Sequence, residues 1–117
     1  MTSSETLATA VQRVWIQLAD RFARLIGHGG IRTLQERSVS VVAVRRTWMS
    51  TPDEGFGADW TGLRTAFEGR AVMEAVEGFE ELVAALLALL ARFIGDALVG
   101  ALLHEMWPGV FPVTQRS

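Results

Sequence analysis

The sequence predicts an all-α fold, a bundle of four to five helices built from two helical hairpins with pseudo-twofold character. Apolar residues recur at spacings of three and four along most of the chain, which is the period of amphipathic helices. The stretch ARLIG at 23–27 also returns as ARFIG at 91–95, 68 positions later. The apolar phase around the two stretches matches on both sides of each glycine. Each half of the chain is therefore expected to be a long helix, a glycine break and a second helix.

The first helix is expected from Ser4 to Ile26, within a hairpin that spans 4–49. Thr2 and Glu5 have the spacing of a capping box, which satisfies free amides at a helix start. The apolar face that follows consists of Leu7, Val11, Val14, Leu18, Phe22 and Leu25. The stretch Gly27-His28-Gly29-Gly30 then predicts an open turn, because glycine readily adopts the left-handed conformation that ends a helix.

The second helix is expected from Ile31 to Met49. The stretch 38–44 is rich in β-branched residues, so propensity alone also allows a strand there. We favour a helix, because one isolated strand would find no sheet partner in this chain. The strand remains the alternative.

A linker with a short helix is expected over 50–70. The loop STPDEGFGA at 50–58 contains one proline and two glycines, which is typical of a connection. Asp59 is a suitable N-cap for a short helix that carries Trp60, Leu63 and Phe67 and is stopped by Gly69.

The second hairpin is expected over 71–107, with a helix from Ala71 to Ile94 and another that starts near Asp96. Between 82 and 91 the sequence is apolar on every side of the helix, which is typical of a bundle centre or a subunit interface. A short tail at 108–117 completes the chain, which we treat as one domain over 1–117.

A membrane span is not expected. The apolar stretch 82–103 is long enough to cross a bilayer, but Arg92 and Asp96 would then lie near its middle. Charged side chains are costly at that depth.

The echo between 23–27 and 91–95 leaves two interpretations open. In one, the two halves are related as a structural repeat. In the other, two amphipathic helices align in phase by accident, since few identities lie outside the motif.

Composition and charge limit the classes of function. Hydrophobic residues make up 50% of the 117 residues, so part of the apolar surface is expected to be covered by a partner, an apolar ligand or a membrane. Up to Thr51, seven Arg accompany three acidic residues, whereas from Pro52 onward four Arg accompany ten. Such halves attract each other, within one chain or between two chains. The net charge of −2 does not favour a nucleic-acid-binding protein.

Few residues offer catalytic or metal chemistry. The chain has no cysteine and no lysine, which excludes thiolate nucleophiles, cysteine-based metal sites and Schiff-base lysines. His28 and His104 lack the Glu-x-x-His and His-x-x-x-His spacings of metal sites on helices. We therefore expect no enzyme activity, no metal and no cofactor. A start without a basic n-region favours a cytoplasmic location.

The stretch LLALLARFIGDALVGALLHEMWP at 86–108 resembles the closing segment of a group of uncharacterised all-α bacterial proteins and domains. In that group an Ile-Gly-acid break leads into a Leu-rich helix that ends in Trp-Pro. The stretch RFARLIGHGGIRTLQERSV at 21–39 is similar to the opening hairpin of the group. Some of these domains accompany bacterial signalling modules. The resemblance implies an all-α fold and a role beside signalling proteins, and it implies no catalytic residue.

The leading prediction is a non-enzymatic bacterial regulatory or protein-interaction module that acts through apolar helix faces, as a homodimer or with a partner protein. Its interface candidates are Leu86, Leu90, Leu98, Leu102, Met106 and Trp107. The alternative is a protein that binds a small apolar ligand in a Trp/Phe/Leu-lined cavity between the hairpins. Its pocket candidates are Trp15, His28, Trp48, Trp60 and Phe93. We expect the binding site near His28 and the subunit contact over 98–107.

Overall fold

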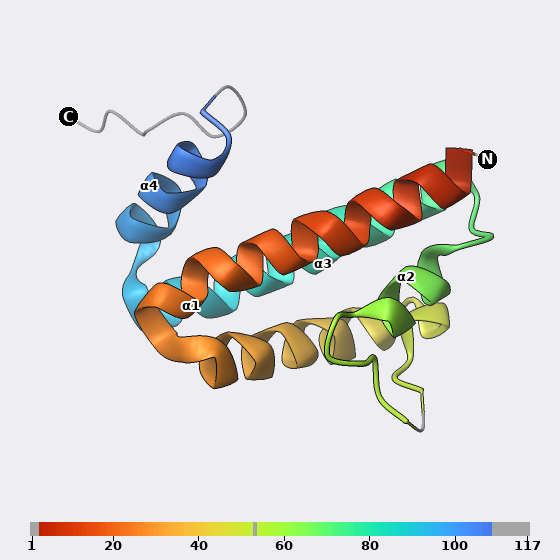
Figure 1. Ribbon diagram of the computed structural model, residues 1–117, viewed down its shortest axis with the longest axis horizontal. Coiled ribbons are helices and arrows are strands. Elements are labelled where there is room, and N and C mark those ends of the chain that lie inside the picture. The colour runs from red at the N-terminus through yellow and green to blue at the C-terminus, as the bar shows by residue number, and fades with distance from the viewer. Residues whose placement is uncertain (1–2, 53, 109–117) are drawn as a thin grey trace.

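The computed structural model describes residues 3–52 and 54–108, with side chains from Leu7 onward. Within these residues the chain is all-α and contains no strand (Figure 1), which confirms the predicted helical bundle. The elements are α1 (Ser3–Ala43), the 3-10 turn η1 (Thr47–Met49), α2 (Thr61–Phe67), α3 (Val72–Ile94) and α4 (Asp96–Met106). The capping box expected at Thr2 and Glu5 lies outside the described side chains, as does the tail after Pro108.

α1 contains both helices of the predicted first hairpin, bent at Gly27. Gly27 has φ 81° and ψ 159° between two runs of helical residues, which we name the first arm (3–26) and the second arm (28–43). The open turn predicted over 27–30 is wrong, because the helix resumes directly after Gly27. Thr33 Oγ1 donates a hydrogen bond to the carbonyl of Gly29 (2.9 Å), which adds a side-chain contact to this turn of helix.

The second arm ends at Ala43, earlier than the predicted end at Met49. Its β-branched stretch is helical through Ala43, so the alternative of a strand there is wrong. The carbonyl of Val42 accepts hydrogen bonds from the amides of Arg45 (3.0 Å) and Arg46 (2.9 Å). This double acceptance closes the helix and directs the chain into η1.

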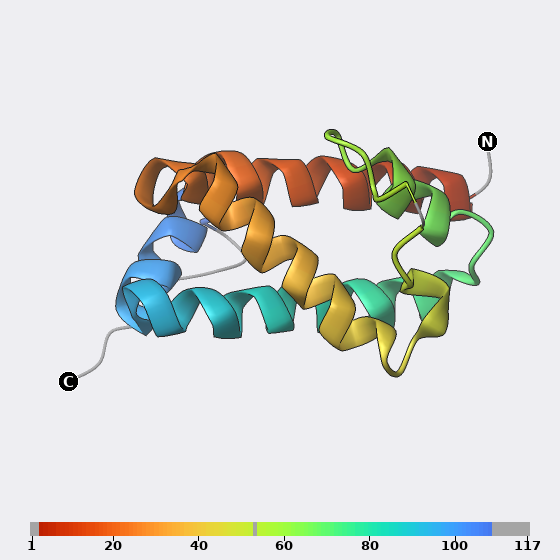
Figure 2. The same cartoon turned by 90° about the horizontal axis from the view of Figure 1, so that it is seen from below.

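The first arm and α3 run in the same direction, and the second arm lies on one side of this pair and runs diagonally from the first arm toward α3 (Figure 1 and Figure 2). Their inward side chains form the core and recur at the helical spacing of three and four residues. Seven of these side chains are each at most 1% exposed, namely Val11, Trp15, Leu18, Phe22, Leu82, Leu86 and Leu90. The glycine breaks of both hairpins lie at one end of the molecule. From that end the second arm and α4 depart on opposite sides, which gives the fold its pseudo-twofold character (Figure 1).

The N-cap of α2 lies one residue later than predicted. The N-cap position is Trp60, which has a left-handed backbone (φ 62°, ψ 25°), and not Asp59. Asp59 instead accepts hydrogen bonds at Oδ1 from the hydroxyl (2.6 Å) and the amide (3.2 Å) of Thr61. These two bonds, the hydroxyl bond first, lower the pKa of the Asp59 carboxyl. Asp59 therefore anchors the start of α2 from outside the helix.

Candidate binding surfaces

α4 is an apolar helix with only part of its surface packed against the rest of the chain. Val99 and Leu103 are buried, whereas Leu98 is exposed and Leu102 and Met106 are half-buried. Figure 1 shows α4 at one end of the molecule, beyond the end of α3. The described structure therefore leaves an apolar side of this helix open to solvent.

Two of the predicted interface residues lie in the core instead. Leu86 and Leu90 are both 0% exposed. Because neither side chain reaches the surface, neither is available to a partner, and we withdraw both from the predicted interface. The other four candidates lie on α4 or directly after it and are at least partly exposed, namely Leu98, Leu102, Met106 and Trp107.

Three large apolar side chains are exposed near the two glycine breaks. Leu25 is 47% exposed, Phe93 68% and Leu98 40%, and we name this set the apolar end. Leu25 and Phe93 occupy the same position in ARLIG and ARFIG. Phe93, predicted to line a pocket, instead points largely into water. Exposed apolar side chains of this size at one end of a small protein are typical of a contact surface.

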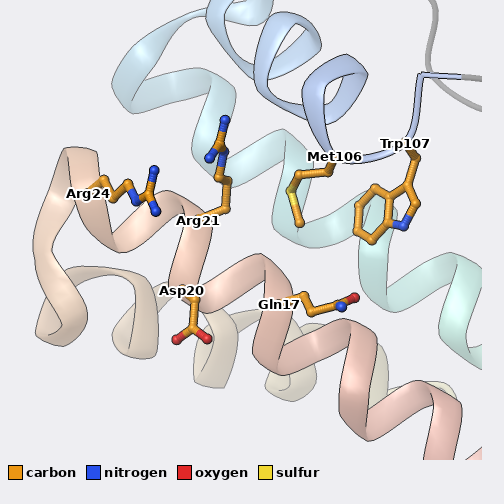
Figure 3. Close-up of a pocket in the computed structure, with 6 residues that line it drawn as sticks. All are labelled: Gln17, Asp20, Arg21, Arg24, Met106 and Trp107. Atoms are coloured by element: carbon orange, nitrogen blue, oxygen red, sulfur yellow. The ribbon is translucent and has the colours of Figure 1, made fainter.

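A hollow of about 310 Å³ lies between the first arm and the end of α4 (Figure 3). Arg21 in this hollow forms an ion pair with Glu105 of α4, which ties α4 back to the first arm. In Figure 3 the guanidinium of Arg24 lies on the same side as that of Arg21, whereas Asp20 points away toward the second arm. The side chain of Arg21 therefore has a structural role in this hollow, because its ion pair holds α4 against the first arm.

A second hollow, which we name the His28 cleft, has a volume of about 450 Å³. It lies between the two arms of α1, and the segment before α2 forms a third wall. The lining residues are Ile16, Ala19, Asp20, His28, Gly29, Ile31, Arg32, Gln35, Ala58 and Trp60. The cleft therefore brings together His28 and Trp60 from the predicted pocket residues, within the first hairpin and not between the hairpins.

The remaining aromatic pocket candidates pack elsewhere. Trp15 is 0% exposed and lies behind Trp60, with the two rings 5.9 Å apart and nearly perpendicular. The ring of Trp48 meets the ring of Phe67 edge-on at 4.9 Å. Trp15 and Trp48 are thus core and near-core packing residues and do not line the His28 cleft.

Gln35 is a polar residue of the His28 cleft that was not among the predicted pocket residues. It is 0% exposed, and its Nε2 donates a hydrogen bond to the carbonyl of Trp15 (2.9 Å). Its Oε1 is buried and has no hydrogen-bond partner among the described residues. The helical period contained a signal, since Gln35 follows the core residue Ile31 by four positions and so lies on the inward face.

The wall formed by residues 57–60 is held in place by Arg32. Its guanidinium lies 4.0 Å from the ring centre of Trp60 and donates hydrogen bonds to the carbonyls of Gly57 (2.9 Å) and Ala58 (3.4 Å). Gln12 adds a hydrogen bond from Nε2 to the carbonyl of Asp59 (2.7 Å). A left-handed backbone is unusual for a residue as bulky as Trp60, so these contacts hold a strained turn.

Ion pairs join the basic first part of the chain to its acidic second part. Arg46 pairs with Glu81 (2.8 Å) and Glu77 (3.7 Å), and Arg45 pairs with Glu81 (3.5 Å). The side-chain hydrogen bonds from Arg46, and then its charge, lower the pKa of Glu81. The predicted attraction between the halves therefore acts within one chain, between the turn at 44–46 and α3.

Comparisons with known proteins identify no relative: no protein-family model, no curated protein and no solved structure matches the chain. None of the helices in the described part of the chain combines the length and hydropathy needed to span a bilayer. Among the described residues, no group of three or more His, Asp or Glu side chains could hold a metal ion.

Proposed function

We propose that this chain is a non-enzymatic interaction module whose apolar end and open side of α4 bind the same surface of a second copy. The exposure of Phe93 carries the proposal, because 68% of this large aromatic side chain lies in water, two residues before the break that leads into α4. Aromatic residues at the centre of an interface supply much of its binding energy. Leu25 and Leu98 would extend the buried apolar area around that anchor.

The charges beside the apolar end favour a second copy as the partner. Arg92 and Asp96 are both exposed and stand on either side of the break at Gly95. In a twofold dimer the same patch occurs on both subunits, so Arg92 of one copy can face Asp96 of the other. Charges of opposite sign at the rim of an apolar contact set its orientation.

The resemblance of 86–108 to the closing segment of bacterial domains that accompany signalling modules supports a regulatory role. We infer that the contact between the two copies is the place at which such a module would be regulated. An equilibrium between subunits, or exchange of one subunit for another apolar helix, would change which proteins the module joins.

The test is the molar mass in solution, measured by light scattering after size exclusion over a wide range of protein concentration. The wild type should form a dimer. The double variant Phe93→Glu/Leu98→Glu should be monomeric, because burying unpaired carboxylates costs at least about 2 kcal/mol, on the order of thirtyfold in Kd. Circular dichroism should show unchanged helix content, since both side chains are exposed in the single chain.

Met73→Glu is the matched control, because Met73 is 73% exposed on α3 but lies near the opposite end of that helix. It should leave the dimer intact. Reversing Arg92→Asp should weaken the dimer, and adding Asp96→Arg should restore it. A wild type that stays monomeric at every concentration, or a dimer that Met73→Glu disrupts as strongly, would overturn the proposal.

A further inference from the structure

We infer that the His28 cleft is a binding site for a small, neutral and mostly apolar molecule that carries one N–H or O–H donor. The residues that line this site do not include those of the apolar end. It lies between the arms of α1, and its volume of about 450 Å³ is in the range of small-molecule sites in proteins.

The walls of the cleft are mainly apolar. Ile16 and Ala19 come from the first arm, Ile31 from the second arm, and Ala58 from the segment before α2. The apolar body of a ligand would contact all three segments. Burial of its surface against these side chains supplies the driving force.

Gln35 specifies the polar group of the ligand. It lines the cleft with 0% of its surface exposed, and its Nε2 is already bound to the carbonyl of Trp15. Its Oε1 accepts no hydrogen bond from any described residue. A buried acceptor without a partner is unfavourable, and a donor on the ligand would satisfy it once the side chains that cover this oxygen move aside. This is the observation that distinguishes the cleft from an ordinary surface hollow.

The charged groups around the cleft do not favour a charged ligand. Arg32 is bound to two carbonyls, to the face of Trp60 and to Glu36. Asp20 and His28 are exposed and therefore remain hydrated at the mouth. The buried wall offers an amide oxygen and no unpaired charge, which suits a neutral donor.

The outer walls of the cleft are in place before any ligand arrives. Arg32 and Gln12 hold the 57–60 wall from two different arms of α1. The bend at Gly27 sets the angle between those arms. Preorganised walls reduce the ordering cost of binding.

Indole and 1-methylindole form a matched pair of probes, since they share an apolar bicyclic body and only indole carries an N–H donor. Each is titrated into the full ¹⁵N-labelled chain and followed by NMR. Indole should shift the amide signals of Gly29 and Ile31 and the side-chain amide of Gln35. It should bind about tenfold more tightly than 1-methylindole, which leaves Gln35 Oε1 unsatisfied.

Two variants separate the hydrogen bond from the cavity. Gln35→Met removes the acceptor at similar volume, so both probes should bind with about equal affinity. Ala19→Leu places a larger side chain in the cleft and should weaken both probes. If Gln35→Met fails to fold, the probe pair on the wild type and Ala19→Leu still decide the question.

Equal affinity of the two probes for the wild type would overturn the inference. So would the absence of shifts at cleft residues, or binding that Ala19→Leu leaves unchanged. Shifts confined to Phe93 and Leu98 would place the probes on the apolar end and would also refute the cleft as the site. The oligomeric state of the chain does not enter these outcomes, so this test and that of the proposed function can fail independently.

Discussion

Gly27 and Gly95 hold almost the same backbone conformation, with φ 81° and ψ 159° at the first and φ 87° and ψ 153° at the second. They are the final glycines of ARLIG and ARFIG. This region of φ and ψ is essentially restricted to glycine. The echo in the sequence therefore marks the same turn made twice, at the same end of the molecule (Figure 1).

Replacing either glycine should destabilise the chain through the backbone alone. A Cβ at Gly27 or Gly95 would meet no atom within 4 Å, so no steric clash would contribute to the change in stability. We expect Gly27→Ala and Gly95→Ala each to lower the free energy of unfolding by about 1–3 kcal/mol. Urea denaturation followed by circular dichroism measures the change.

Gly29→Ala provides the control for this prediction. Gly29 also has open space around its Cβ position, but it lies within the helical second arm. Alanine should therefore stabilise the chain there by about 0.5–1 kcal/mol. Gly27→Ala and Gly29→Ala changing stability in the same direction would show that the bend does not depend on the conformation of Gly27.

The position of the breaks could be predicted because its cause is local. A glycine at the end of an apolar helical run is sufficient to indicate the turn. The behaviour after Gly27 could not be predicted in the same way, because two further glycines normally oppose a helix. Ile31 is 1% exposed, and its place in the core holds this part of the second arm. Tertiary packing therefore outweighed local propensity at 28–30.

The composition of α3 does not indicate which of its faces points into the core. Between 82 and 91 all sides of this helix are apolar, so the pattern within this stretch alone does not single out an inward face. In the fold Leu86 and Leu90 point inward and Phe93 outward. The strained Trp60 and the free oxygen of Gln35 likewise depend on contacts between segments distant in sequence, which periodicity cannot supply.

Gly62 is a close-approach position, and Gly62→Ala should be destabilising. A Cβ there would lie 2.8 Å from Phe56 Cα and 3.0 Å from the Phe56 carbonyl oxygen, which are backbone atoms that cannot rotate away. Overpacking should exceed the gain in helix propensity, for a net loss of about 1–2 kcal/mol in thermal unfolding. Gly100→Ala, in α4 with no atom within 4 Å, should instead be stabilising. A neutral Gly62→Ala would mean that α2 can move off the preceding loop.

Arg32→Met should loosen the wall of the His28 cleft without unfolding the core. The variant loses the hydrogen bonds to Gly57 and Ala58 and the charge over Trp60. The amides of Trp60 and Gly62, which donate within this segment, should exchange hydrogen with solvent about tenfold faster. Arg37→Met changes an exposed arginine on the same arm and should leave these rates unchanged. Equal protection in both variants would assign the rigidity of the wall to other contacts.

Glu81 should make stability depend on pH in the acid range. Its pKa is lowered in the folded chain by Arg46, so the ion pair stabilises the fold at pH values above the ordinary glutamate pKa. That contribution is lost as the pH falls through the lowered pKa, from about pH 5 downward. The pKa of Arg46 is raised, which changes nothing below strongly alkaline pH. Glu81→Gln should therefore be less stable at pH 7 and lose less stability between about pH 6 and pH 3.

Glu80→Gln is the control for this prediction, because it alters an exposed neighbour. It should keep the wild-type dependence of stability on pH. Parallel slopes for wild type and Glu81→Gln would show that this ion pair does not couple folding to pH.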